Sequence, residues 1–272
     1  MELSLGSISG KEGEMTSALE ESYQEAQRHV RQAPAKNVDE TGWKRCGRWL
    51  WVAATPSAAL FHIDRGRNWH ALQQLLGRKI QGVICTDRFS LYNYIQLGRR
   101  AICWAHLKRD FVRWTERGEK TVYLGEEGLA IVSAVCKLWR EFASRRFGRE
   151  RLRRKLRPLR KRMDKLLEWG MQCGVKQAIH FCRYLQRLKP AMWTFARVKG
   201  IEPTNNHAER MLRPGVIWRK KSLGCHSAEG CRYAERMMTV IQTLKLNGRS
   251  VMQFLSDALH AHRQGLSSPA LL

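Results

Sequence analysis

Three short apolar runs follow a polar N-terminal stretch. They cover residues 38–44, 49–55 and 59–63, and Pro56-Ser57 makes a turn between the second and the third. Short runs of strand-forming residues with tight joins are typical of an antiparallel meander. We therefore expect three consecutive antiparallel strands.

Helical and strand-like spacing then alternate. Residues 68–76 are expected to form a helix because their large apolar residues recur at helical spacing: Trp69, Leu72, Leu75 and Leu76. Residues 82–87 are a short apolar run ending at Asp87, which is typical of a buried parallel strand. A helix over 90–97 and a strand over 100–103 complete the order β-β-β-α-β-α-β.

A long helical tract is expected from Trp104 to about Leu188. Its centre, residues 140–165, is dense in Arg and Lys, interleaved with apolar residues at helical spacing: Leu152, Leu156, Leu159, Met163, Leu166 and Leu167. Such a helix has one apolar stripe and one cationic face. A solvated face and a phosphate-binding face both fit this pattern.

The C-terminal third begins after the chain-breaking residues 200–203. We expect a short helix over 206–212, a basic loop or strand over 214–224, and amphipathic helices over 231–246 and 250–262. At the other end of the chain, we expect a loosely held leader in which 16–33 could form a short helix.

This pattern predicts an α/β fold with a mixed sheet and a large helical insertion. We expect four parts: a flexible leader (1–36), the first part of the core (37–104), a basic helical insertion (105–200) and the C-terminal core helices (201–272).

Charge narrows the class of partner. The 272 residues include 49 Lys and Arg against 24 Asp and Glu, a formal net charge of +25. Such an excess favours a polyanion, most commonly nucleic acid. The chain also has ten Trp, which are rare in ribosomal or chromatin-like proteins. We expect most of them to lie in the core, including Trp43, Trp49, Trp51 and Trp104.

Cysteine usage and hydropathy indicate the compartment. The eight Cys form no C-x-x-C pair and suggest no disulfide framework, which favours a reducing cytoplasm. No apolar stretch approaches the roughly 20 residues of a membrane span. The N-terminus is polar and acidic, unlike a signal peptide.

Three carboxylates are candidates for a catalytic metal site. Taken alone, Glu209 in its basic surroundings is better explained as an ion-pair partner. However, Asp39 lies on the first expected strand, Asp87 ends the fourth, and Glu209 lies on a later helix. That pattern matches the ribonuclease-H-like fold. Carboxylate oxygens suit Mg²⁺, and two ions about 4 Å apart can serve phosphodiester cleavage.

The acids near this set are weaker candidates for metal ligands. Glu40 should point to the opposite face of the strand from Asp39, so only one of the two can be a ligand. Asp64 is expected to pair with Arg65 or Arg67. Asp110 is expected to form ion pairs along its helix with Lys108 or Arg113.

Five motifs together are specific, and the chain resembles a transposase of the insertion-sequence-66 family, of the Asp-Asp-Glu type. The motifs are VDET (38–41), TDRFSLY (86–92), CWAHL (103–107), PTNNHAER (203–210) and IWRK (217–220). The resemblance covers residues 37–263. It implies a ribonuclease-H-like fold with a helical insertion before the last acid.

The resemblance also implies a function. The protein would be a DNA transposase that cleaves and transfers strands at insertion-sequence ends. Asp39, Asp87 and Glu209 would be its catalytic residues and would hold two Mg²⁺ (or Mn²⁺) ions. His106 and Asn206 could support these ligands. Basic residues near the acids are expected to contact phosphates: Arg88, Arg210, Arg213, Arg219, Lys220 and Lys221. Trp218 could stack on a base.

Partners and location follow from the same family. We expect transposon-end and target DNA, a homo-oligomer in the active complex, accessory proteins of the same element and no membrane. The location would be the bacterial cytoplasm, at the nucleoid.

Some features depart from the family. Its full-length members carry an N-terminal DNA-binding region and a small zinc module, and we expect this chain to lack both. An alternative function is therefore a catalytically idle DNA-binding remnant, and a ribonuclease or junction nuclease on the same fold is another. His207 could touch the metal site, although we favour solvent.

A zinc site is a further alternative. Cys103 and His106 could form one half and Cys225-His226 the other. We expect Cys103 in the core instead, and no zinc.

Overall fold

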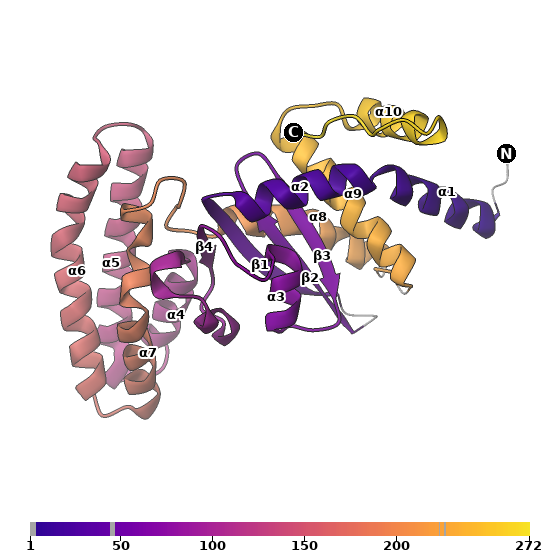
Figure 1. Cartoon of the computed structure of the whole chain (residues 1–272). Coiled ribbons are helices and arrows are strands. Elements are labelled where there is room, and N and C mark those ends of the chain that lie inside the picture. The colour runs from indigo at the N-terminus through magenta and orange to yellow at the C-terminus, as the bar shows by residue number, and fades with distance from the viewer. Residues whose placement is uncertain (1–3, 44–46, 223, 226) are drawn as a thin grey trace. The chain divides into compact units, whose positions relative to one another are not determined.

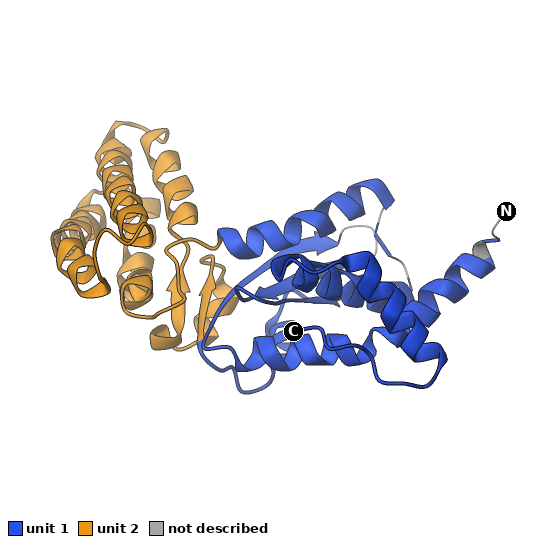
Figure 2. Ribbon diagram, turned by 90° about the horizontal axis from the view of Figure 1, so that it is seen from above, with its two compact units in different colours: residues 1–82, 206–272 blue, residues 83–205 orange. Residues whose placement is uncertain are grey.

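The computed structural model describes residues 4–43, 47–222, 224–225 and 227–272 (Figure 1). The chain divides into two compact units (Figure 2). Unit 1 comprises residues 1–82 and 206–272, and unit 2 comprises residues 83–205. The five strands are ordered β3-β2-β1-β4-β5 in a mixed sheet, which confirms the expected α/β class.

Unit 1 contains the expected antiparallel meander. Its strands are β1 (Ala35–Trp43), β2 (Arg48–Ala54) and β3 (Ala59–Asp64). β1 pairs with β2 and β2 with β3, so that Asp39 lies opposite Val52. Residues 50–54 of β2 are all buried, because this central strand is covered on both faces.

Six α-helices surround this meander among the described residues. They are α1 (Leu5–Ala18), α2 (Glu20–Gln32), α3 (Trp69–Leu76), α8 (Asn206–Ser222), α9 (Ala228–Leu246) and α10 (Val251–Arg263). α3, α9 and α10 lie where the apolar spacing predicted them. α8 contacts β1 and β2, and α9 contacts β3.

Side chains of α9 bond the backbone of β3. Thr239 Oγ1 accepts the Phe61 N–H at 3.0 Å, Thr243 Oγ1 accepts the Ala59 N–H at 3.2 Å, and Glu235 accepts the Ile63 N–H. An edge strand with unpaired N–H groups is a template for unwanted strand pairing. α9 therefore occupies the donors of this edge.

The expected loose leader is wrong. Residues 5–32 form α1 and α2, and α2 buries Ser22, Ala26 and Val30. The Tyr23 hydroxyl donates to the Phe61 carbonyl at 3.0 Å, and Arg236 pairs with Glu20. The buried residues of α2 recur at four-residue spacing, but they are small or polar, so the stripe does not stand out as apolar in the sequence.

Two further local predictions are also wrong. The basic stretch 214–222 continues α8 as a helix, despite Pro214 in its interior. Gly215 lies against Leu50 and Met238, so packing on the sheet outweighs the hydrogen bond that proline removes. The helix expected over 90–97 is instead two short 3₁₀ turns, η2 (Ser90–Tyr94) and η3 (Leu97–Arg99).

Unit 2 joins two parallel strands to the helical tract. β4 (Val83–Thr86) pairs with β5 (Arg100–Ile102). The helices are α4 (Trp104–Thr115), α5 (Glu119–Ala143), α6 (Arg149–Gln172) and α7 (Lys176–Met192), followed by the 3₁₀ turn η4 (Thr194–Ala196). β4 and β5 thus belong to the same compact unit as the helices, whereas we expected the boundary after residue 104.

The helices of unit 2 contact one another in chain order, α4 with α5, α5 with α6 and α6 with α7 (Figure 1). The apolar stripe expected on α6 is buried, including Leu152, Leu156 and Met163. Close approach of α4 and α5 depends on glycine. A Cβ added at Gly128 would lie 2.2 Å from the ring of Phe111.

We predict that Gly128→Ala destabilises the protein by about 1–3 kcal/mol, because the added methyl group overpacks the α4–α5 contact. Urea unfolding would measure the change. Gly13→Ala in α1 is the matched control, since its Cβ would meet nothing within 4 Å. Alanine's better helix propensity should make that variant up to about 1 kcal/mol more stable. Equal stabilisation by both substitutions would contradict the packing argument.

Candidate active site

Asp39 lies in the middle of β1 and is half-buried. Its neighbour Val38 is fully buried on the alternate face of the strand. Asp39 Oδ1 accepts the N–H of Glu40 at 3.0 Å, which helps to orient the carboxylate.

Glu40 has a structural role. Arg67 donates from Nε and Nη2 to Glu40 Oε1, at 2.9 and 2.7 Å. The Glu40 side chain is only 1% exposed, and the Arg67 guanidinium also lies 4.8 Å from the ring centroid of Trp49. A buried carboxylate held in this way has its charge compensated by arginine. Of the two adjacent acids, Asp39 is therefore the better candidate for a metal ligand.

Asp87 directly follows β4, at the carboxyl end of the strand. Its Oδ1 accepts the Phe89 N–H at 2.8 Å, and its carbonyl accepts from Thr86 Oγ1 and from Arg100. Arg100 is fully buried, and burial lowers its pKa. It also donates to Asn93 at 2.9 Å, so one buried cation fixes the segment that carries Asp87.

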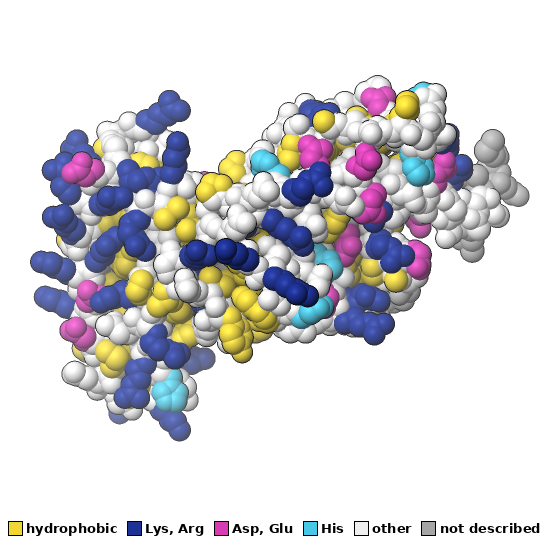
Figure 3. Space-filling view, in the orientation of Figure 1, with side chains coloured by type: hydrophobic (Ala, Val, Ile, Leu, Met, Phe, Trp, Pro, Cys, Tyr) yellow, Lys and Arg dark blue, Asp and Glu magenta, His cyan; other side chains and the backbone are white. Residues whose placement is uncertain are grey.

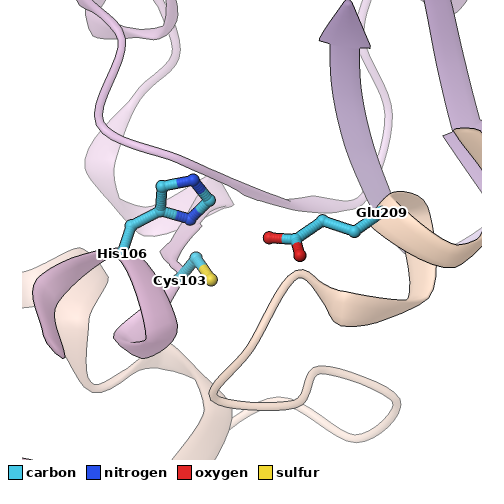
Figure 4. A group of neighbouring side chains, drawn as sticks. All are labelled: Cys103, His106 and Glu209. Carbon is cyan, nitrogen blue, oxygen red and sulfur yellow. The ribbon is translucent and has the colours of Figure 1, made fainter. Parts of the chain in front are cut away.

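Glu209 projects from the first turn of α8 (Figure 4) and is half-buried. His207 Nε2 donates to the Thr55 carbonyl at 2.7 Å and anchors this turn, so the preference for a solvent-facing His207 is wrong. The helix N-terminus favours a carboxylate electrostatically. Because α8 contacts β1, Glu209 and Asp39 lie on neighbouring elements of unit 1, while Asp87 belongs to unit 2.

Cys103, His106 and Glu209 are of metal-ligating residue types (Figure 4), and the first two belong to unit 2 whereas Glu209 belongs to unit 1. Cys103 precedes α4 in unit 2, and His106 lies in the first turn of that helix. Cys103 is fully buried, and its sulfur accepts the Asn205 N–H at 3.1 Å. This bond gives the thiol a local structural role in unit 2. Within unit 2, the sulfur of Cys103 and the imidazole of His106 are ligand types that suit Zn²⁺ better than Mg²⁺.

The basic candidates near the acids fall into two groups. Arg88 pairs with Asp110 and lies over the Phe181 ring, and Arg219 donates to the Gly42 carbonyl and, at 3.2 Å, to Thr41. Both therefore fasten the protein's own elements. Four others are exposed along α8: Arg210, Arg213, Lys220 and Lys221. Asn206 is exposed at the start of the same helix.

Trp218 is packed against the core of unit 1. Its ring meets Tyr233 edge-on, with centroids 6.3 Å apart. Trp43, Trp51 and Trp104 are buried, as expected. Trp218 is thus held by protein contacts on at least one side.

The expected partner of Asp64 is wrong, whereas Asp110 has an expected partner and a further one. Asp64 accepts the Gly66 N–H at 2.6 Å, because the chain turns directly after β3, and Arg67 pairs with Glu40 instead. Asp110 binds Arg88, 22 residues earlier in the chain. The expected pairing of Asp110 with Arg113 is present at 3.8 Å.

Cys225 and Cys231 form a thiol pair that the sequence pattern did not predict. Their sulfurs lie 2.9 Å apart, and Trp43 Nε1 donates to Cys225 Sγ at 3.1 Å. The hydrogen bond from Cys231, helped by that from Trp43, lowers the pKa of Cys225 to about 7. No spacing rule marks a pair six residues apart in a turn and a helix. His226, the neighbouring candidate for zinc, lies outside the described residues.

Comparison with known proteins now identifies the family. The model of the Transposase IS66 family matches residues 1–233, which include the strand, the loop and the helix that carry the three acids. The chain belongs to the IS66 family of transposases. This membership confirms the resemblance drawn from the motifs.

One curated relative of this IS66 transposase chain is an uncharacterized protein, y4qI, from Sinorhizobium fredii (strain NBRC 101917 / NGR234). It is 26% identical over 245 residues, which cover 80% of this chain and 44% of the relative. The chain thus spans less than half the length of that relative. No solved structure matches the chain. Within the described residues, no helix is both long and apolar enough to cross a membrane.

We predict that Cys225 is alkylated by iodoacetamide with a midpoint near pH 7. Its lowered pKa populates the reactive thiolate about two pH units below the ordinary value of 9.0. Mass spectrometry of the Cys225 peptide across a pH series would measure this midpoint. Cys231→Ala removes the main hydrogen bond and should move the midpoint upward. An unchanged midpoint in that variant would show that Cys231 does not set the reactivity.

Proposed function

We propose that this protein catalyses metal-dependent DNA strand cleavage and strand transfer at insertion-sequence ends. Asp39, Asp87 and Glu209 are its catalytic carboxylates. The observation that carries the proposal is the match of the transposase family to residues 1–233, within which all three acids lie in the motifs noted in the sequence.

The placement of each acid supports its assignment. Asp39 is distinguished from Glu40 because Glu40 is bound by Arg67. Asp87 lies at the carboxyl end of a parallel strand, where ligands of open α/β sheets gather. Glu209 lies at a helix N-terminus on α8, which contacts the strand carrying Asp39.

The donor chemistry fits magnesium. Three carboxylates offer hard oxygen ligands, which Mg²⁺ and Mn²⁺ accept while keeping several waters. Asp39 and Asp87 would share two ions, and Glu209 would complete the second. When bound, the ions stabilise the charge on the attacking and leaving oxygens of the phosphodiester.

The proposed reaction has two steps, strand cleavage and strand transfer. In cleavage, a water oxygen bonds to phosphorus as the bond from phosphorus to the 3′-oxygen breaks, and the end is left with a 3′-hydroxyl. In transfer, that hydroxyl attacks a target phosphodiester and displaces the target's own 3′-oxygen. The exposed cations Arg210, Arg213, Lys220 and Lys221 would hold the phosphates, because they follow Glu209 along α8. The active complex would contain more than one copy of the chain and accessory proteins of the element.

We predict that Asp87→Asn lowers Mg²⁺-dependent cleavage of end-containing duplex DNA by at least about 100-fold, because a neutral amide binds a divalent ion far more weakly than a carboxylate does. Asparagine keeps an oxygen for the Phe89 N–H, so the fold and salt-sensitive DNA binding should persist. Gel assays of cleavage and binding would measure both. Asp257→Asn is the control, since Asp257 is an exposed acid on α10.

The outcomes separate the alternatives. Full cleavage by Asp87→Asn would overturn the assignment of the acids. Retained DNA binding without nicking by the wild-type chain, in Mg²⁺ or Mn²⁺, would favour the idle DNA-binding remnant. Preferential cutting of an RNA–DNA hybrid or of a four-way junction would indicate a ribonuclease or a junction nuclease.

A further inference from the structure

The exposed face of α6 in unit 2 is strongly cationic. The helix carries ten basic residues and three acidic ones, and its apolar stripe is buried. Figure 3 shows the Lys and Arg side chains gathered over this part of the molecule. Solubility alone does not require such an imbalance of sign on one helix.

Some of these cations hold the unit together. Arg149 donates to the carbonyls of Phe195 and Val198, and Arg153 donates to that of Ala196. Arg162 forms a bidentate pair with Glu127 at 2.8 Å. Arg160 is half-buried, and the other basic residues of α6 that make none of these contacts are exposed: Arg151, Arg154, Lys155, Arg157, Lys161 and Lys165.

A cavity of about 390 Å³ adjoins this face within unit 2. Its lining residues come from α6, α7 and the turn after α7: Arg160, Asp164, Lys189, Pro190, Trp193 and Arg197. Lys189 pairs with Asp164 at 2.9 Å. The lining contains no second carboxylate to balance the guanidinium groups of Arg160 and Arg197. The cavity therefore has an excess of positive charge.

Arg160 differs from the other residues that line the cavity. Its guanidinium lies 5.2 Å from the ring centroid of Trp193, and its buried Nε has no hydrogen-bond partner among the described residues. Burial lowers the pKa of Arg160, and the positive charges of Arg197 and Arg153 lower it further, whereas the negative charge of Asp164 raises it. A buried donor without a partner and crowded like charges both cost stability. An anion in the cavity would offset the crowding of like charges.

We propose that this cavity binds a DNA backbone phosphate, and that it continues with the exposed cations of α6 as a duplex-binding surface of unit 2. Arg151 to Lys165 spans about 21 Å along the helix, which corresponds to about six base pairs of duplex. Contacts of this kind position DNA without reading its sequence. The inference rests on the proposed function only for the choice of DNA as the ligand.

The test is the salt dependence of binding to a 20-base-pair duplex, measured by fluorescence anisotropy in EDTA from 50 to 200 mM NaCl. Loss of this one phosphate contact in Arg160→Ala/Arg197→Ala should reduce the slope of log affinity against log salt by about 1. The wild type would then lose about fourfold more affinity than the variant over this range. Lys120→Ala/Lys137→Ala removes the same charge from exposed positions of α5 and should leave the slope unchanged.

A second variant guards against misfolding. Arg157→Ala/Lys161→Ala changes only exposed residues of α6 and should also reduce the slope, while circular dichroism stays as in the wild type. Equal slopes for all the variants, or a reduced slope only with duplex RNA, would overturn the inference. Binding in EDTA requires no cleavage, so this outcome is independent of the Asp87→Asn result. If the wild type cleaves DNA but the variants keep the wild-type slope, the duplex-binding surface is refuted and the proposed catalytic function is not.

Discussion

The packing of α8 on the meander is the constraint on which unit 1 depends. Gly215 brings the helix against Leu50, His207 bonds the Thr55 carbonyl, and Arg219 bonds the Gly42 carbonyl. These contacts fix both the start and the end of a helix that has a proline in its interior. They also hold Glu209 on an element next to the strand that carries Asp39. The catalytic role proposed for Glu209 would need such fixed placement, because small displacements of reacting groups weaken catalysis.

The excess of arginine has two physical uses in this protein. Some guanidinium groups bind backbone carbonyls and buried acids, as Arg100 does at Asp87 and Arg67 does at Glu40. Arginine suits this because its planar donors satisfy several acceptors at once. Other cations remain exposed on α8 and α6. Net charge alone therefore overstates how many residues are available to a polyanion, because each cation's availability depends on its own contacts.

The sequence predicted features that depend on local periodicity. The three strands of the meander, the strand before Asp87, helix α3 and the buried stripe of α6 were all found in place. Features that depend on distant contacts were not predicted. A short helix over 16–33 was considered, but the packing of α2 was not predicted because its buried residues are small or polar, and the continuation of α8 past Pro214 depends on packing against Leu50. The Arg88–Asp110 pair and the cavity at Arg160 join residues that only the fold brings together.

The central claim is that Asp39, Asp87 and Glu209 hold two divalent ions. Anomalous diffraction from crystals of the protein grown with Mn²⁺ and end DNA tests it most directly. The account predicts two Mn²⁺ peaks about 4 Å apart, each ligated by oxygens of these carboxylates. A single peak on Cys103 and His106, with no metal ligated by Asp39 or Asp87, would contradict it.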